Sequence, residues 1–201
     1  MGKVITINRQ FGSGGREVGK RLSQALSYFY YDKELVYKLS ELSGLDPTYI
    51  ENNCEKYNTA SYPYMIGRSF MSYQQPIVQM NIDLQIKQRE MILDIAQKED
   101  AVIIGRCADY ILKNENVFKV YIYASNMDFR VKRCFDNAPE GENKTEEQMR
   151  KQILQIDKQR SKYYNQYTGQ KWGDMQNYNL CIDTSKVGIK KAVEIIIEAI
   201  K

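Results

Sequence analysis

Residues 4–20 read VITINRQFGSGGREVGK, and this stretch decides the fold. Its first part, Val4–Asn8, is mostly apolar and β-branched, which predicts a buried strand. Three glycines follow within four positions, and a helix-forming segment runs from about residue 15 to 27. A glycine-rich turn between a strand and a helix lets backbone N–H groups point inward at the positive end of the helix dipole. The stretch therefore predicts an anion cradle. The alternative is a tight turn that needs glycine for its backbone angles and binds nothing.

The alignment of this turn with the phosphate-binding motif decides which basic side chain contacts the phosphates. The spacing from Gly14 to Lys20 fits the GxxxxGK pattern of a Walker A loop. That register would place Lys20 more than one turn inside the helix, and Arg21 would stand where Ser or Thr is expected. Counted from the end of the strand, Gly15 is the last glycine of the motif and Arg16 replaces its lysine. We therefore predict that Arg16, and not Lys20, contacts the β- and γ-phosphates of a nucleotide.

A dinucleotide-binding turn is the competing interpretation. Gly12, Gly15 and Gly19 have a similar rhythm, and Asp32 lies about where an acid that binds a ribose would stand. Glu17 occupies the third glycine of the strict GxGxxG pattern, however, and the chain has no histidine for hydride chemistry. An oxidoreductase of the Rossmann type therefore ranks behind a phosphate-binding enzyme.

The rest of the chain alternates between strands and helices. Apolar, β-favouring runs predict further strands, and helical patterns separate them. Such an order is typical of βαβ units and a parallel sheet, with ligands beyond the carboxyl ends of the strands. We therefore predict a three-layer α/β/α fold with a five-stranded parallel sheet and residues 4–8 in its middle. The further strands are expected at 29–31, 101–104, 118–123 and 179–183, and helices at about 33–43, from 47, 74–98, 126–137, 145–164 and 188–201; 58–73 has the composition of a loop.

Composition limits the chemistry. At 201 residues the chain is long enough for one domain with a core and too short for two. It has no histidine, which excludes Ser-His hydrolases and most zinc enzymes. Its four cysteines form no CxxC pair and indicate a reducing compartment. The net charge of +4 is concentrated in two basic segments, which suits a bound nucleotide better than nucleic acid. No run is apolar enough to span a membrane, and we expect a cytoplasmic protein.

Several segments together resemble one family. ITINRQFGSGGREVGKRL, YYDKELV, VIIGRCADYIL, DKQRSKYYNQYTGQKWGD and NLCIDTS follow one another in the order found in the cytidylate kinase-like family. This family is a divergent branch of the P-loop nucleoside monophosphate kinases. The resemblance spans nearly the whole chain, and the GRCAD and YYNQYTGQKWGD segments are its most specific parts.

The resemblance implies a division of one kinase domain into three parts. The core is expected at about 1–31, 99–125 and 178–201, with an acceptor-binding helical segment at about 32–98 and a lid with its following helix at about 126–177. The cradle for a triphosphate would consist of Gly12, Ser13, Gly14, Gly15, Arg16, Glu17 and Val18. Related kinases have a glycine and then a threonine where this chain has Glu17 and Val18, so the usual hydroxyl ligand of magnesium is missing. Either Ser13 or a bridging water would replace it, and the metal ligands stay open.

The acceptor site is implied by residues after the second and third strands and on a later helix. Asp32 resembles the acid that opens the acceptor segment, although it also suits the N-cap of a helix. Arg106 resembles an arginine that meets the acceptor. Cys107 stands where relatives have an aspartate, and Asp109 lies two residues later. Asp157 and Arg160 resemble an Asp-x-x-Arg pair that holds the sugar and phosphate of the acceptor; the alternative is an exposed helical ion pair.

Two further arginines complete the predicted site. Arg130 and Arg133 resemble the lid arginines that close over a transferring phosphoryl group, and their spacing puts them on one face of a helix. With Arg16 they are the predicted catalytic residues. The function implied is transfer of a phosphoryl group from ATP, with Mg²⁺, to a small phosphorylated acceptor such as a nucleoside monophosphate. The alternative is a nucleotide-binding regulatory domain without turnover. Small nucleotides are the expected partners, and a homodimer stays open.

Overall fold

The computed structural model describes residues 2–54, 76–139 and 143–201. Its centre is a five-stranded sheet in the order β2-β3-β1-β4-β5, and every neighbouring pair is parallel. The predicted parallel sheet and the central place of the first strand are both confirmed. The strands are β1 Val4–Arg9, β2 Phe29–Tyr31, β3 Ala101–Ile104, β4 Val117–Tyr123 and β5 Leu180–Asp183.

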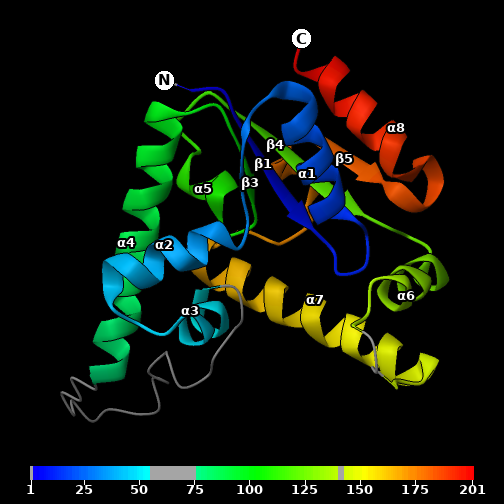
Figure 1. Cartoon of the computed structure of the whole chain (residues 1–201), viewed down its shortest axis with the longest axis horizontal. Helices are drawn as coiled ribbons and strands as arrows, with labels where there is room; N and C mark the ends of the chain where they lie inside the picture. Colours follow the sequence, from blue (N-terminus) through cyan, green and yellow to red (C-terminus); the bar gives the residue numbers. More distant parts are fainter. Residues whose placement is uncertain (1, 55–75, 140–142) are drawn as a thin grey trace.

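The two faces of the sheet are covered by different helices, because neighbouring residues of a strand point to opposite faces. Ile5 and Ile7 pack in one cluster with side chains of α1 Gly15–Leu26 and α8 Thr184–Ala199. Val4 packs in a second cluster with side chains of α2 Glu34–Ser43, α3 Pro47–Cys54, α4 Pro76–Lys98 and α5 Ala108–Ile111. The result is the predicted three-layer arrangement (Figure 1).

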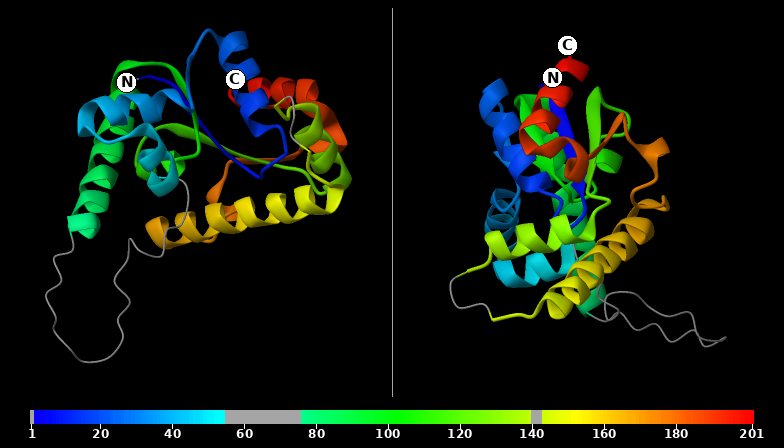
Figure 2. Two further views of the ribbon diagram at one scale, coloured as in Figure 1. Left: turned by 60° about the horizontal axis from the view of Figure 1, so that its bottom comes forward. Right: turned by 90° about the vertical axis from the view of Figure 1, so that its right-hand side faces the viewer.

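Two helices lie at the carboxyl end of the sheet rather than on its faces. Helix α7, Glu146–Thr168, crosses below the strands in Figure 1, and Figure 2 shows it leading from α6, Met127–Asp136. A capping box of Thr145 and Gln148 begins α7, and Gly169 ends it in the left-handed conformation. The helix is therefore longer than the predicted 145–164, and it spans the edge at which the glycine turn lies.

The structure corrects the prediction at two places and adds a short helix. Helix α8 begins at Thr184, and Gly188, with φ 76° and ψ 166°, interrupts it where we expected its first residue. The four-residue α5 was too short to give a periodic signal. The predicted loop at 58–73 lies outside the residues that the structure describes. Across the described ranges, no helix has the length and apolar character needed to cross a membrane.

Candidate functional site

The glycine turn joins the central strand to α1 at the carboxyl end of the sheet. Gly12 and Gly14 have φ of 76° and 82°, and Gly14 is the N-cap of α1. Only glycine adopts these angles at little cost, which explains the cluster. A cavity of about 540 Å³ opens on the turn. Its lining includes the predicted residues Gly12, Gly14, Gly15, Arg16, Glu17, Arg133 and Arg160, together with Arg9, Gln10, Phe11, Lys20 and Tyr30.

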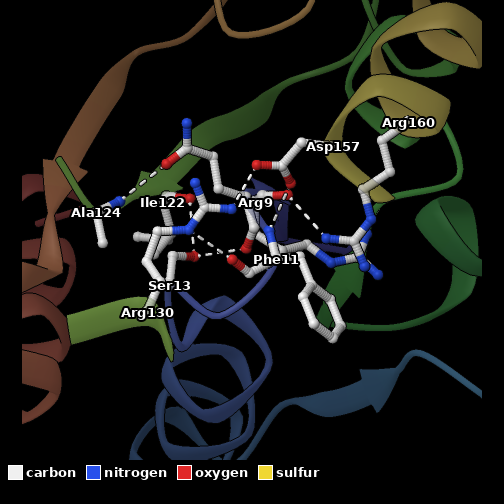
Figure 3. A network of polar contacts seen from close by, with 9 residues as sticks. Arg9, Phe11, Ser13, Ile122, Ala124, Arg130, Asp157 and Arg160 are labelled. Atoms are coloured by element: carbon white, nitrogen blue, oxygen red, sulfur yellow. Dashed lines mark hydrogen bonds and ion pairs between the residues drawn. The ribbon is translucent and has the colours of Figure 1, made fainter. Parts of the chain in front are cut away.

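The turn is held from below by side chains that face the sheet. The Ser13 hydroxyl donates to the carbonyl oxygens of Gln10, at 2.8 Å, and Ile122, at 3.1 Å (Figure 3). The Thr184 hydroxyl donates to the Ser13 carbonyl at 2.7 Å. Ser13 is fully buried, so its hydroxyl points away from the cavity. The structure thus gives no support to Ser13 as a replacement for the missing hydroxyl ligand of magnesium.

Arg130 and Asp157 hold the turn at Phe11. The Arg130 Nε donates to the Phe11 carbonyl at 2.7 Å, and Asp157 Oδ1 accepts from the Phe11 N–H at 2.8 Å. A charge-assisted hydrogen bond joins Arg130 Nη2 to Asp157 Oδ2, so the pair and the Phe11 peptide groups form one network (Figure 3). Arg130 is only 4% exposed, and neither side chain lines the cavity. Both predicted ligand-binding residues therefore lie behind the turn.

Arg16 and Arg133 lie on the cavity side of the turn. The Asp32 carboxylate accepts from both Arg16 Nε, at 2.8 Å, and Arg16 Nη2, at 3.3 Å. Arg133 Nη2 donates to Glu17 at 2.6 Å, and Arg21 contacts the same carboxylate at 2.7 Å. Burial alone would raise the pKa of Glu17, but the hydrogen bonds and charges of Arg133 and Arg21 outweigh it and lower that pKa. Each outward arginine is thus already oriented by a carboxylate.

A second, smaller cavity adjoins the first. It has a volume of about 20 Å³ and is lined by three arginines, Arg9, Arg106 and Arg160, of which Arg9 and Arg160 also line the first cavity. Arg106 is 5% exposed and stands in an unusual turn, in which Gly105, Arg106 and Cys107 all have φ between 53° and 68°. Left-handed backbone is strained for residues with a side chain, and such strain gathers at functional sites. The predicted acceptor residues Arg106 and Arg160 are therefore brought together.

Asp109 lies apart from both cavities. It is 3% exposed and accepts a hydrogen bond from the Tyr164 hydroxyl at 2.7 Å, which ties α5 to α7. Burial raises the pKa of Asp109 above its ordinary value. Of the predicted residues, those that line neither cavity are Ser13, Val18, Asp32, Asp109, Arg130 and Asp157.

Sequence reasoning missed several polar residues at the cavity, among them Arg9, Gln10 and Tyr30. Gln10 Oε1 accepts from the Ala124 N–H at 3.1 Å and joins the turn to the end of β4. Burial and the Asp32 carboxylate raise the pKa of Tyr30 to about 12, so its hydroxyl stays protonated. Arg9 carried the one usable signal, because it is the charged residue at the carboxyl end of a strand that is otherwise uncharged.

Comparisons with known proteins agree with this geometry. Residues 4–186 match the cytidylate kinase-like family. A crystal structure of an uncharacterized protein from Eubacterium ventriosum ATCC 27560 is similar, with 29% sequence identity, 98% of each chain covered and a TM-score of 0.72. No curated protein matches the sequence.

The fold is also that of shikimate kinases. The enzyme from Bacteroides thetaiotaomicron is 15% identical, with 98% of each chain covered and a TM-score of 0.57. A shikimate kinase from Acinetobacter baumannii in complex with shikimate is 13% identical over 100% of this chain and 93% of that one, with a TM-score of 0.52. At these identities the likeness concerns the fold alone.

Proposed function

Because this chain belongs to the cytidylate kinase-like family, we propose that it transfers the terminal phosphoryl group of ATP to a small phosphorylated acceptor, a nucleoside monophosphate. One observation carries this proposal. Two adjoining cavities meet at the carboxyl end of the sheet, one on the glycine turn and one against Arg106, and they share Arg9 and Arg160. A donor in the first and an acceptor in the second would place their phosphates next to each other.

The chemistry needs positioning and charge neutralisation more than proton transfer. An acceptor phosphate is already anionic, so the reaction requires no general base, and a chain without histidine can perform it. Arg16 and Arg133 would bind the donor phosphates and the transferred group, and Arg106 and Arg160 the acceptor phosphate. Guanidinium groups suit these contacts because their fork geometry matches phosphate oxygens.

We propose a different role for Arg130 and Asp157 from the ligand contacts that the sequence suggested. Both act on the Phe11 peptide groups and line neither cavity. We therefore assign them the task of holding the turn at the distance that donor binding requires. Misplacing such a turn by a fraction of an ångström lowers the rate of transfer, since the reacting atoms must lie close together and in line.

The acceptor cavity must widen when its ligand enters. A volume of about 20 Å³ holds one water molecule, not a phosphate. The cavity lies between the turn at Arg106 and the end of α7, where Tyr163 and Tyr164 line it. We propose that a shift of α7 away from the turn at Arg106 supplies this space, as moving segments do in other enzymes.

Magnesium is the expected companion of the donor, but the residues at the cavity do not form a site for it. The nearest carboxylates, Glu17 and Asp32, are paired with arginines, and the Ser13 hydroxyl faces the sheet. Nowhere in the described ranges do three His, Cys, Asp or Glu side chains lie close enough to share a metal ion. Mg²⁺ often keeps several waters and binds through substrate phosphates. We therefore assign no protein ligand to it and derive no step from it.

The test is release of ADP from ATP and Mg²⁺ with a panel of acceptors. The panel contains CMP, dCMP, UMP, AMP and GMP, and shikimate serves as an acceptor without a phosphate. We expect rapid ADP release with at least one monophosphate and none with shikimate. Tight ATP binding without turnover on any acceptor would favour the regulatory domain, and turnover on shikimate alone would refute a phosphorylated acceptor.

A further inference from the structure

We propose that Arg9 contacts the phosphoryl group that is transferred, as a cation that the central strand adds to the arginines of the glycine turn and of α6. This proposal rests on the proposed function and concerns a residue that the sequence did not single out. Arg9 is the last residue of β1 and is 4% exposed, yet it lines both cavities. A residue that lines both can reach a group that passes from one to the other.

The start of α1 lies close against the end of β1 at Arg9. A Cβ at Gly15 would lie 2.9 Å from Arg9 Cγ and nearer still to Arg9 Cβ, and also 3.4 Å from Ile122 Cβ. The contact with Arg9 Cβ would arise with any side chain at position 9, so Gly15 is required by the close approach of strand and helix. This approach places the Arg9 side chain beside the first residue of α1, and the N-terminus of a helix favours anions.

Arg160 and Asp32 are neighbours of Arg9. Its carbonyl oxygen accepts from Arg160 Nη1 at 3.1 Å, and the Arg160 guanidinium stacks over the Phe11 ring. The Arg9 guanidinium lies 3.8 Å from the Asp32 carboxylate, whereas Arg16 reaches the same carboxylate at 2.8 Å. A direct charge-assisted hydrogen bond is about 2.7–2.9 Å long. Asp32 therefore orients Arg9 at long range and is bound closely by Arg16.

This placement suits the transition state. Charge on the transferred group is redistributed during the reaction, and a fixed cation in a site with little water stabilises it at no cost of reorganisation. A guanidinium has five N–H donors in one plane and can serve oxygens on both sides. Arg9 should therefore affect turnover more than the binding of ATP.

The main variant is Arg9→Met, which keeps a side chain of similar length, and Asp32, the carboxylate beside Arg9, retains its closer partner Arg16. Turnover is measured with ATP, Mg²⁺ and the acceptor that releases ADP fastest from the wild-type chain; ATP affinity is measured by calorimetry. We expect turnover to fall at least ~100-fold, as when other electrostatic donors are removed, while ATP affinity changes less than tenfold. The control is Lys3→Met, which removes an exposed cation before the opposite end of the same strand. Normal turnover in Arg9→Met would overturn the assignment and leave the proposed function standing.

A second variant, Arg9→Lys, tests the proposal even if Arg9→Met fails to fold. In Arg9→Lys the contacting cation can lose its proton, since a lysine has a pKa near 10.4 and burial lowers it. Turnover of Arg9→Lys should therefore decline between about pH 8 and 10, where an arginine stays charged. A pH profile identical in shape to that of the wild-type chain refutes the contact. A wild-type chain that releases no ADP with any acceptor overturns both proposals together.

Discussion

Arginine–carboxylate pairs lie on both sides of the glycine turn, on the inner side behind the turn and on the outer side at the cavity, and they serve different purposes. On the inner side, Arg130 and Asp157 form an ion pair in which the side chains are 4% and 14% exposed. On the outer side, Arg16 is 47% exposed beside Asp32, and Arg133 is 21% exposed beside Glu17. An arginine–carboxylate pair behind the turn can bind only protein, whereas a pair at the cavity keeps donors for a ligand. Burial, and not residue type, separates the two tasks.

Helix α6 shows the same contrast within one turn. Arg130 and Arg133 are three residues apart, yet Arg130 contacts the Phe11 carbonyl while Arg133 lies against Gly14, whose added Cβ would be 3.2 Å from the Arg133 guanidinium carbon. Their spacing places Arg130 and Arg133 on one face of α6. Arg130 nevertheless contacts the inner side of the glycine turn and Arg133 the outer side, so the two arginines have different roles. Variants that separate stability from turnover can test this division.

The largest effect is expected from Asp157→Ala. The change leaves Arg130 buried without its carboxylate and removes the acceptor of the Phe11 N–H. Breaking a buried ion pair in this way costs about 3–5 kcal/mol, which urea unfolding measures as a lower free energy of unfolding. The control is Glu147→Ala on the same helix, where the carboxylate is 76% exposed and a change within about 0.5 kcal/mol is expected. If Asp157→Ala lowers the free energy of unfolding by less than ~1 kcal/mol, its ion pair contributes no more than an exposed pair does, which would contradict the proposal that Asp157 holds the turn.

Arg133→Ala should show the opposite pattern. If Arg133 contacts the transferred group, turnover falls at least ~100-fold, while the free energy of unfolding changes by at most about 1 kcal/mol. Lys132→Ala is the matched control, because Lys132 is the neighbouring cation on α6 and its side chain is 76% exposed. Equal turnover in Arg133→Ala and Lys132→Ala would show that Arg133 does not contact the transferred group. Steady-state kinetics and urea unfolding of the same preparations measure both quantities.

Arg16→Ala and Lys20→Ala test the register of the turn. Both residues line the cavity, and Arg16 is oriented toward it by Asp32. Loss of a charge-assisted contact costs about 1.5–3 kcal/mol, so Arg16→Ala should weaken ATP binding roughly 10- to 150-fold in calorimetry. Lys20→Ala should leave the affinity nearly unchanged. The reverse ranking would establish the GxxxxGK register that we rejected.

The smallest effect concerns the pH dependence of the outer pair. Arg133 and Arg21 hold the pKa of Glu17 below its ordinary value in the folded chain. Glu17 therefore stabilises the fold fully above its unfolded pKa of about 4.3, and this contribution is lost as the pH falls through the lower folded value. The difference in unfolding free energy between the wild-type chain and Glu17→Gln should shrink over that acidic range. A difference that is constant from pH 7 to 3 would show that the pair does not stabilise the fold.

The sequence was sufficient for most of the fold because its strands are continuous apolar runs. Ala101–Ile104, for example, is fully buried and admits no other interpretation once a glycine and a charge follow it. Local patterns identified the glycine turn and Arg16, and the family resemblance pointed to Arg106, Arg133 and Arg160; all four arginines line the cavities.

The sequence could not rank the arginines by burial. Whether Arg130 faces ligand or protein depends on Phe11 and Asp157, which are 119 and 27 positions away along the chain. Arg9 differs from an ordinary charge at a strand end only through its contact with Gly15 and the second cavity. Such contacts arise from tertiary packing, which no local pattern encodes.

The order of the strands also determines when the central strand can find its partners. β1 pairs with β3 and β4, and Lys3, just before β1, bonds to Asp100, which is 97 positions away. At a synthesis rate of about 5–20 residues per second, residues 4–9 leave the ribosome roughly 5–20 s before residue 101. Throughout this interval the central strand of the sheet has neither neighbour. Pairing of the central strand therefore starts only after the middle of the chain has been made, and pairing between segments so distant in sequence is slow.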